Sequence, residues 1–283
     1  MLGYFCVVLQ NRRILFYACK FRDRRKIYGT APYNKAMSTL QPALAAITHY
    51  HSRYHFPSPS QSTAVQKAME GAKRVHGSPC VPRKIMTLDI LKICLANLSL
   101  SSSNFVKLRT VWRMTIEYFG LLRFNEIQNL CTTDITFDST GMFIYIERSK
   151  TDQRGVRDHV RVLNHADSTI CPIRLTRLYL DKLGYQQGVM LPSLRGKIPN
   201  PKVAITYKTA LRDLKNTLIS IGVDPTGFGE HSGRRGGTTA AAAAGAPHAS
   251  LKSQGRWKSD SSVERYTDNA KAAKETFARY LSH

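Results

Sequence analysis

The sequence predicts a mainly helical, α+β protein with two domains, the second of which contains a small antiparallel β-sheet. Apolar residues recur every three or four positions along most of the chain, which is typical of amphipathic helices. Only one region combines two β-rich runs around a polar turn. A turn-rich stretch at 77–82 separates a short helical part from a longer one. With 283 residues, 42% of them apolar, the chain is long enough for two cores.

Residues 1–33 show no lasting periodicity, and we interpret them as an irregular basic leader. Their basic cluster at 22–26 is compatible with a nuclear localisation signal, a DNA-contacting arm or an ordinary solvated stretch. Residues 34–85 are expected to form a small helical domain. The spacing of Leu40, Leu44 and Ile47 predicts its first helix, and a second is expected over about 62–75.

Residues 86–283 are expected to form the larger domain. Its first helix should begin after Thr87, a typical N-cap residue. Further helices are predicted around 105–119, 172–184, 202–221 and 232–244. β-Branched and aromatic residues at 142–148 and 156–163 flank the polar segment 149–155, which predicts a hairpin. This is the only strand region that the pattern predicts with clarity.

The charge of the chain indicates a polyanionic partner. Lys and Arg number 42 against 19 Asp and Glu, a formal net charge of +23. Every part of the chain contributes to this excess, which suits many phosphate contacts better than a single basic arm does. No apolar run approaches the ~20 residues of a spanning helix, so double-stranded DNA is favoured over a membrane.

The six cysteines are dispersed and contain no Cys-x-x-Cys pair. We interpret them as reduced core residues of an intracellular protein, without disulfides or a zinc site. The apolar run near the N-terminus is short and no basic residue precedes it, so no signal peptide is predicted.

Four residues near the C-terminus form a recognisable series: His231, Arg234, Trp257 and Tyr266, at intervals of 3, 23 and 9. This series resembles the C-terminal signature of the tyrosine recombinases, or phage-type integrases: His-x-x-Arg, then His or Trp, then Tyr. The sequence Gly-Arg-Trp-Lys-Ser at 255–259 is especially similar to the corresponding segment in recombinases of DIRS-like and Crypton-like mobile elements.

Two upstream segments complete the family's set of catalytic motifs in the expected order. Leu-Leu-Arg-Phe-Asn-Glu-Ile at 121–127 resembles the first arginine motif, with Arg123 and its acidic companion Glu126. Lys150, in the turn of the predicted hairpin, resembles the family's β-hairpin lysine. A lone His-x-x-Arg would be a weak signal, whereas six roles in the correct order are a strong one.

The resemblance implies a SAM-like core-binding domain over 34–85 and a catalytic domain over 86–283. It implies DNA recombination or integration through a 3′-phosphotyrosine intermediate, with no metal, cofactor or ATP. It also implies a homotetramer on paired DNA sites, in which the terminal helix at 270–283 is exchanged between neighbours. The site of action would be chromosomal DNA, in the nucleus if the host is a eukaryote. The first domain is short for the family, which puts DNA encirclement in doubt.

Each residue has a chemical task in this interpretation. Arg123 and Arg234 can clamp the non-bridging phosphate oxygens. Tyr266 is the nucleophile, and His231 either assists its deprotonation or holds the phosphate. Lys150 can protonate the leaving 5′-oxygen, and Trp257 can donate one hydrogen bond and pack beside the nucleophile helix.

Other basic residues are expected to contact DNA phosphates or to remain solvated charges: Lys73, Arg74, Arg83, Lys84, Arg235, Arg256 and Lys258. Taken singly, each catalytic candidate could equally be an ordinary cap, turn or core residue. Two other functions stay open: a degenerate or domesticated DNA-binding protein, and a type IB topoisomerase-like enzyme that reseals the same strand.

Overall fold

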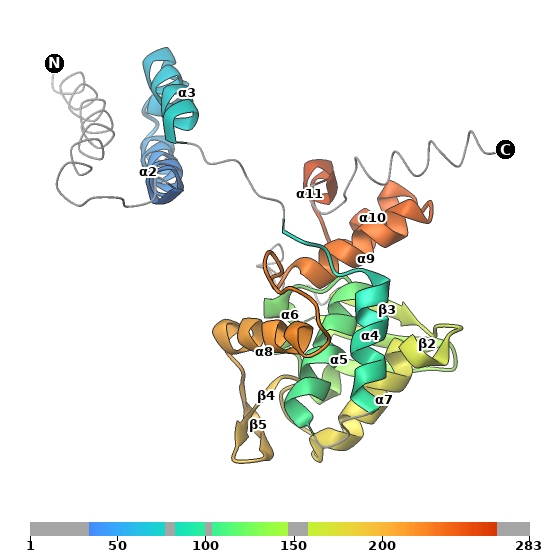
Figure 1. Ribbon diagram of the computed structural model, residues 1–283. Helices are drawn as coiled ribbons and strands as arrows, with labels where there is room; N and C mark the ends of the chain where they lie inside the picture. The colour runs from blue at the N-terminus through green and yellow to red at the C-terminus, as the bar shows by residue number, and fades with distance from the viewer. Residues whose placement is uncertain (1–33, 77–82, 100–103, 147–157, 265–283) are drawn as a thin grey trace. The chain divides into compact units, whose positions relative to one another are not determined.

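The computed structural model describes residues 34–76, 83–99, 104–146 and 158–264. The chain divides into two compact units, residues 1–81 and 82–283, which are treated separately below. Helix and strand labels follow Figure 1.

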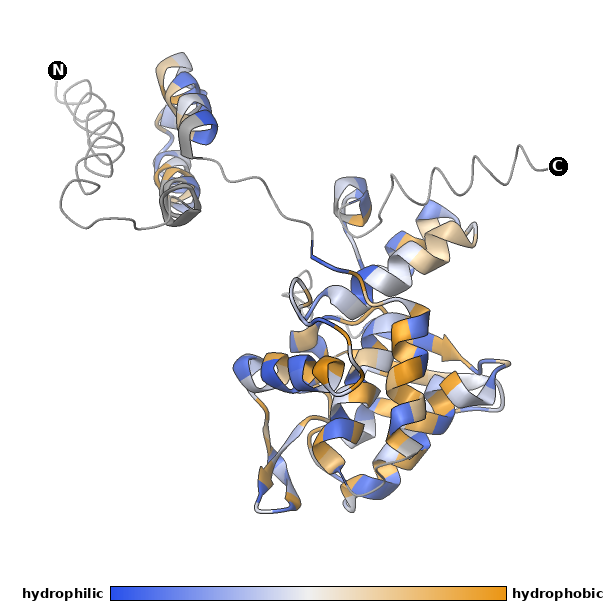
Figure 2. Ribbon diagram, in the orientation of Figure 1, coloured by the Kyte–Doolittle hydropathy of each residue, from blue (hydrophilic) through white to orange (hydrophobic). Residues whose placement is uncertain are grey.

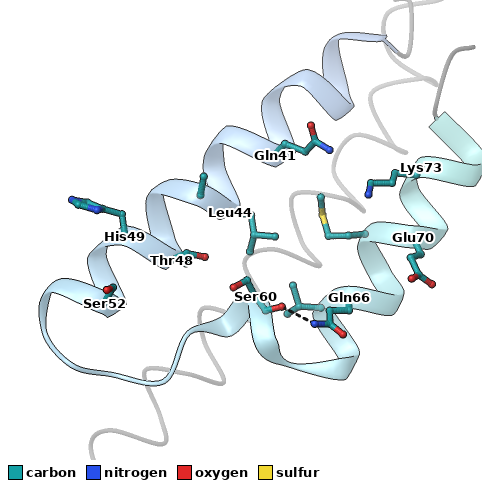
Figure 3. Close-up of a pocket in the computed structure, with 12 residues that line it drawn as sticks. Gln41, Leu44, Thr48, His49, Ser52, Ser60, Gln66, Glu70 and Lys73 are labelled. Atoms are coloured by element: carbon teal, nitrogen blue, oxygen red, sulfur yellow. Dashed lines mark hydrogen bonds between the residues drawn. The ribbon is translucent and has the colours of Figure 1, made fainter. Parts of the chain in front are cut away.

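The smaller unit contains two helices, α2 (Asn34–Arg53) and α3 (Thr63–His76), joined through the 3₁₀ turn η1 (Pro59–Gln61). The side chain of Ser58 caps that turn by accepting a hydrogen bond from the Ser60 backbone N–H. A shallow pocket lies between α2 and α3 (Figure 3), and most of the side chains that line it are exposed or half-buried.

The larger unit is mainly helical and carries two small antiparallel sheets (Figure 1). Its helices are α4 (Leu88–Ser99), α5 (Phe105–Phe119), α6 (Phe124–Asn129), α7 (Pro172–Leu183), α8 (Tyr207–Ile219), α9 (Ser232–Ala243), α10 (His248–Gly255) and α11 (Asp260–Glu264). The strands are β1 (Ile135–Phe137), β2 (Gly141–Ile146), β3 (Asp158–Leu163), β4 (Pro192–Arg195) and β5 (Ile198–Ala204), and the 3₁₀ turns are η2 (Thr132–Asp134) and η3 (Ser168–Ile170).

Helix α5 is the centre of this unit and contacts α4, α7, α8 and α9. All ten residues from Arg109 to Tyr118 are buried, so the helix has no solvent face in its middle. Trp112 stacks on Tyr179 of α7 with ring centroids 4.6 Å apart. In Figure 2 the apolar residues gather in α4 and in the strands, where they meet this core.

The predicted hairpin is present. β2 pairs antiparallel with β3 and also with the short strand β1. The inward face consists of Met142, Ile144, Ile146, Val160 and Val162, all of which are buried, while the alternating residues face outward. The segment that joins β2 to β3, including Lys150, lies outside the described residues.

Several sequence predictions of secondary structure need correction. The helix expected over 202–221 begins only at Tyr207, because residues 198–204 form β5 and Thr206 caps the helix. The pair β4–β5 was not predicted, since its two prolines in β5 and its short strands mask any alternation. The short elements β1 and α6 were also missed. By contrast, Thr87 does cap α4, with its Oγ1 accepting from the Ile90 N–H at 3.3 Å.

Among the described residues, Cys94 and Cys171 are buried free thiols. In the same part of the chain, no helix is long and apolar enough to cross a membrane.

Candidate active site

Three of the predicted catalytic residues converge on the turn between α5 and α6. Leu121, in this turn, has a φ of 50°, the left-handed region that side chains other than glycine rarely adopt. Its carbonyl oxygen accepts a hydrogen bond from Arg234. Arg123 follows two residues later, and Trp257 packs in the same small apolar cluster as Leu121. Backbone strain of this kind often accompanies functional sites.

Arg123 is held by the glutamate that the sequence assigned to it. Arg123 is the N-cap residue of α6, and its Nη1 donates to Oε1 of Glu126 at 2.5 Å. The second oxygen of Glu126 accepts from the backbone N–H of Arg123 at 2.8 Å. One carboxylate therefore fixes both the backbone and the guanidinium of Arg123. That guanidinium remains partly exposed, at 15%, which leaves it open to a ligand.

Arg234 is buried, with no exposed surface, in the first turn of α9. Its two terminal nitrogens donate to the carbonyl oxygens of Leu121 and Gly255. The guanidinium carbon lies 4.3 Å from the centroid of the Trp257 ring, a cation–π contact. Arg234 therefore joins the α5–α6 turn to the end of α10. Neighbouring Arg235 points elsewhere, to the carbonyl of Arg83, so the structure distinguishes the two adjacent arginines.

The glycines after Arg234 bring α9 close enough for this arrangement. A Cβ atom added to Gly236 would lie 1.8 Å from the carbonyl oxygen of Met86. One added to Gly237 would lie 2.0 Å from the carbonyl oxygen of Tyr118, near the end of α5. Any larger residue would therefore push α9 away from both backbones. The sequence Gly-Arg-Arg-Gly-Gly thus combines the arginine with the space it needs.

Trp257 fixes the segment that leads to Tyr266. Its ring is buried with Leu121, Leu251 and Val263, and Val263 belongs to α11. Since α11 ends at Glu264, this cluster anchors the chain two residues before Tyr266. Packing against the neighbouring helix was one of the two tasks expected of Trp257. Tyr266 itself lies outside the described residues.

His231 is exposed at the N-cap position of α9, three residues before Arg234. Its backbone carbonyl accepts from the Arg235 N–H at 3.0 Å, so the helix orients it. The structure thus places His231 beside the α9 turn that carries Arg234. Lys150 and Tyr266 lie outside the described residues. Within the described ranges, no three His, Cys, Asp or Glu residues are grouped to hold a metal ion.

The predicted DNA-binding residues are arranged less uniformly. Five are exposed: Lys73 and Arg74 on α3, Arg83 and Lys84 before α4, and Lys258 after Trp257. Lys84 also forms an ion pair with Asp224 at 2.8 Å. Arg235 is half-buried.

Arg256 differs from the other predicted DNA-binding residues, because only 8% of it is exposed and it pairs with Glu126. Its guanidinium therefore faces the interior of the unit, which corrects the expectation of a solvated charge.

A second charged cluster was not anticipated. Arg113, in the middle of α5, donates to both Glu117 and Glu230, and all three residues are buried. Burial raises the pKa of Glu117 to about 8, against the attraction of Arg113. Because Glu230 directly precedes His231, the cluster ties the start of α9 to α5. Charged residues in an otherwise apolar helix were the available signal, but their partner is distant in sequence.

Comparison with known proteins bears on this geometry. No family model matches the chain. A protein of Selenomonas ruminantium described as an integrase/recombinase xerD homolog is 26% identical over 247 residues, covering 84% of this chain and 70% of that protein. The chain is therefore similar to the tyrosine recombinases.

Solved structures of tyrosine recombinases share the fold. The XerH recombinase in a post-cleavage complex with palindromic difH gives a TM-score of 0.60 at 16% identity, covering 94% of this chain and 72% of that one. The Tn1549 transposon integrase with circular intermediate DNA gives 0.59 at 15% identity, covering 92% and 84%. XerA recombinase gives 0.54 at 15% identity, covering 95% and 91%. The predicted fold class is therefore confirmed.

The roles of individual residues of this chain remain predictions, as does its similarity to DIRS-like and Crypton-like elements. The division into a core-binding and a catalytic domain is also a prediction. Arg83, Lys84 and Met86 belong to the larger unit, where the Met86 N–H donates to the Ser232 carbonyl at 2.9 Å.

Proposed function

We propose that this chain is a site-specific DNA recombinase or integrase of a mobile element, with Tyr266 as its nucleophile. One observation carries the proposal. Arg123 and Arg234 meet at the Leu121 turn, and Trp257, stacked on Arg234, anchors the helix that ends two residues before Tyr266. Two guanidinium groups and the helix that precedes Tyr266 are thereby held in one cluster. Attack of a phenol on a phosphodiester requires such fixed positions.

In the proposed reaction the phenol oxygen of Tyr266 attacks a backbone phosphorus. A bond forms between that oxygen and phosphorus, and the bond from phosphorus to the 5′-oxygen breaks. The product is a 3′-phosphotyrosine and a free 5′-hydroxyl. Attack by a 5′-hydroxyl of another strand reverses these steps and reseals the backbone, so the bond energy is conserved and neither ATP nor a metal ion takes part.

The charge of the cluster suits this reaction. Arg123 and Arg234 both bring a guanidinium group to the Leu121 turn, and Glu126 orients that of Arg123. These two groups can offset the negative charge that develops on the non-bridging oxygens. Burial of Arg234 places its charge where water screens it little.

Two residues are proposed to move protons. The phenol of Tyr266 has an ordinary pKa near ~10, so it needs a base or a positive field to be deprotonated. His231, exposed beside Arg234, is suited to accept that proton or to bind the phosphate. Lys150, in the segment that joins β2 to β3, is proposed to protonate the leaving 5′-oxygen.

The proposed active assembly is a homotetramer on two double-stranded DNA sites, with residues 270–283 exchanged between neighbours. The core-binding domain, residues 34–85, is proposed to contact the duplex through Lys73 and Arg74, which are exposed on α3. Analytical ultracentrifugation of the protein on paired sites tests the assembly, and a stable complex of another stoichiometry would contradict it.

The decisive experiment for the nucleophile uses a nicked candidate-site duplex, selected beforehand from a library by binding. Cleavage beside the nick releases a short fragment and traps the covalent protein–DNA adduct. We expect an adduct from wild type and none from Tyr266→Phe, since only the attacking oxygen is lost. Tyr54→Phe, at an exposed tyrosine of the smaller unit, should react like wild type.

The outcomes separate the rival functions. An adduct that persists in Tyr266→Phe contradicts the nucleophile. Binding without an adduct in wild type indicates a DNA-binding protein that no longer cuts. An adduct together with supercoil relaxation but no strand exchange between two sites indicates a topoisomerase-like enzyme.

A further inference from the structure

Arg256 adopts a backbone conformation that an arginine rarely has. It follows α10 with φ 54° and ψ 47°, in the left-handed region where helices commonly end on glycine. A glycine is present, but one position earlier. A Cβ atom on Gly255 would lie 2.0 Å from the Trp257 ring, so this glycine makes room for the tryptophan. The strained position therefore falls to Arg256.

The side chain of Arg256 is buried and makes a specific set of contacts. Its Nη2 donates to Oε2 of Glu126 at 2.5 Å and lies 3.4 Å from the Leu121 carbonyl. Its Nη1 donates to the Gln254 carbonyl at 2.9 Å. An arginine retained in a strained conformation, with a buried ion pair, has a role that a freely solvated charge would not need.

Glu126 is shared between Arg256 and Arg123. Its Oε1 binds the Arg123 guanidinium and its Oε2 binds both the Arg123 backbone N–H and Arg256. Burial alone would raise the pKa of Glu126, but the charges of Arg256 and Arg123 hold it below its usual value. The carboxylate therefore stays charged and links the two arginines.

We propose that Arg256 is a positioning residue for DNA cleavage, acting on Arg123 through Glu126. Its ion pair ties the end of α10 to the first turn of α6, while the next residue, Trp257, packs on Arg234 and on α11. Arg123, Arg234 and the segment leading to Tyr266 are thereby set in one geometry. This inference rests on the proposed function.

A direct phosphate contact is the rival role for Arg256, and the two roles differ in what they change. Loss of a phosphate contact weakens DNA binding and lowers the salt dependence of binding by about one charge. Loss of a positioning residue lowers the rate at saturating DNA instead. A misplacement of about 1 Å is enough to slow a reaction by about 100-fold.

The test compares Arg256→Gly with Arg256→Lys. Glycine removes the ion pair and relieves the backbone strain at the same time, so a loss of activity cannot come from strain. Lysine keeps a charge but not the forked donor. We expect adduct formation at saturating nicked duplex to slow by about 10- to 100-fold in Arg256→Gly and less in Arg256→Lys. The dissociation constant and its salt dependence should stay near those of wild type.

A double-mutant cycle with Glu126→Gln identifies the route of the effect. If Arg256 acts through Glu126, the double variant Arg256→Gly with Glu126→Gln should be about as slow as the slower single variant. Independent effects would multiply and overturn the proposal. Thermal unfolding and the final yield of adduct report the folded fraction, and Arg256→Lys serves for the comparison if the glycine variant does not fold.

The remaining outcomes are distinct. Arg256→Gly reacting at the wild-type rate overturns the proposal, and so does a loss confined to DNA affinity and its salt dependence. If wild type forms no adduct, it is the proposed function that fails.

Discussion

Two arginine clusters lie in the larger unit, one within α5 and one at the α5–α6 turn, and they differ in their partners and in their exposure. At Arg113, one guanidinium meets two acidic side chains, Glu117 and Glu230, and the three are buried. At the α5–α6 turn, two guanidinium groups, those of Arg123 and Arg256, share the carboxylate of Glu126, and Arg123 is partly exposed. The first cluster is closed to ligands, whereas the second presents one guanidinium to solvent.

This difference shows why a count of buried arginines does not locate a site. Arg113 and Arg234 are equally well buried and both are hydrogen-bonded. Arg113 pairs with Glu117 and Glu230, so its charge is neutralised within the protein. Arg234 meets carbonyl oxygens and an aromatic ring, which orient it.

The largest effect is expected from breaking the closed cluster. Arg113→Met leaves two buried carboxylates without their cation, so the free energy of unfolding should fall by about 3–5 kcal/mol. Urea denaturation followed by circular dichroism measures it. Adding Glu117→Gln and Glu230→Gln to this variant should recover much of the loss, since no buried charge then remains. If Arg113→Met unfolds at the same urea concentration as wild type, the cluster contributes no stability.

A smaller free-energy change, confined to catalysis, is expected in the open cluster. Arg234→Lys keeps a charge but cannot reach both carbonyl oxygens, so adduct formation at saturating DNA should slow by about 100- to 1000-fold. Arg235→Lys, one residue along α9, is the matched control and should leave the rate within about threefold, as expected of a simple phosphate contact. Equal losses in the two variants would contradict the assignment of Arg234.

The dependence of stability on pH sharpens the comparison further. The pKa of Glu117 is raised from 4.5 to about 8 in the folded protein, so folding favours its protonated form. This stabilisation is complete below pH 4.5 and is lost as pH rises towards 8.

Glu117→Gln removes that dependence. Its Tm should rise relative to wild type as pH increases over this window, by roughly 2–4 °C for each 1 kcal/mol. Melting curves at matched ionic strength measure the shift. If the difference in Tm between Glu117→Gln and wild type stays constant with pH, Glu117 does not titrate in this pH range.

The sequence alone predicted the fold class, the hairpin of β2 and β3, and most helices. It also proposed Arg123, His231, Arg234 and Trp257 as residues of the site. These depend on local periodicity and on motif spacing, both of which are written along the chain. Weak elements such as β4 and β5 were not predictable, because their prolines obscure the pattern and their pairing is tertiary.

Only the tertiary structure decided where the side chain of Arg256 lies. From the sequence it was one basic residue beside Trp257, equivalent to Lys258. In the fold it is buried and 2.5 Å from Glu126, a residue 130 positions away, while Lys258 stays exposed. That contact joins the end of α10 to the first turn of α6, and no local pattern reports a distance between such remote residues. Residue types and their order thus predict the chemistry, whereas the sharing of one carboxylate between two arginines arises from packing.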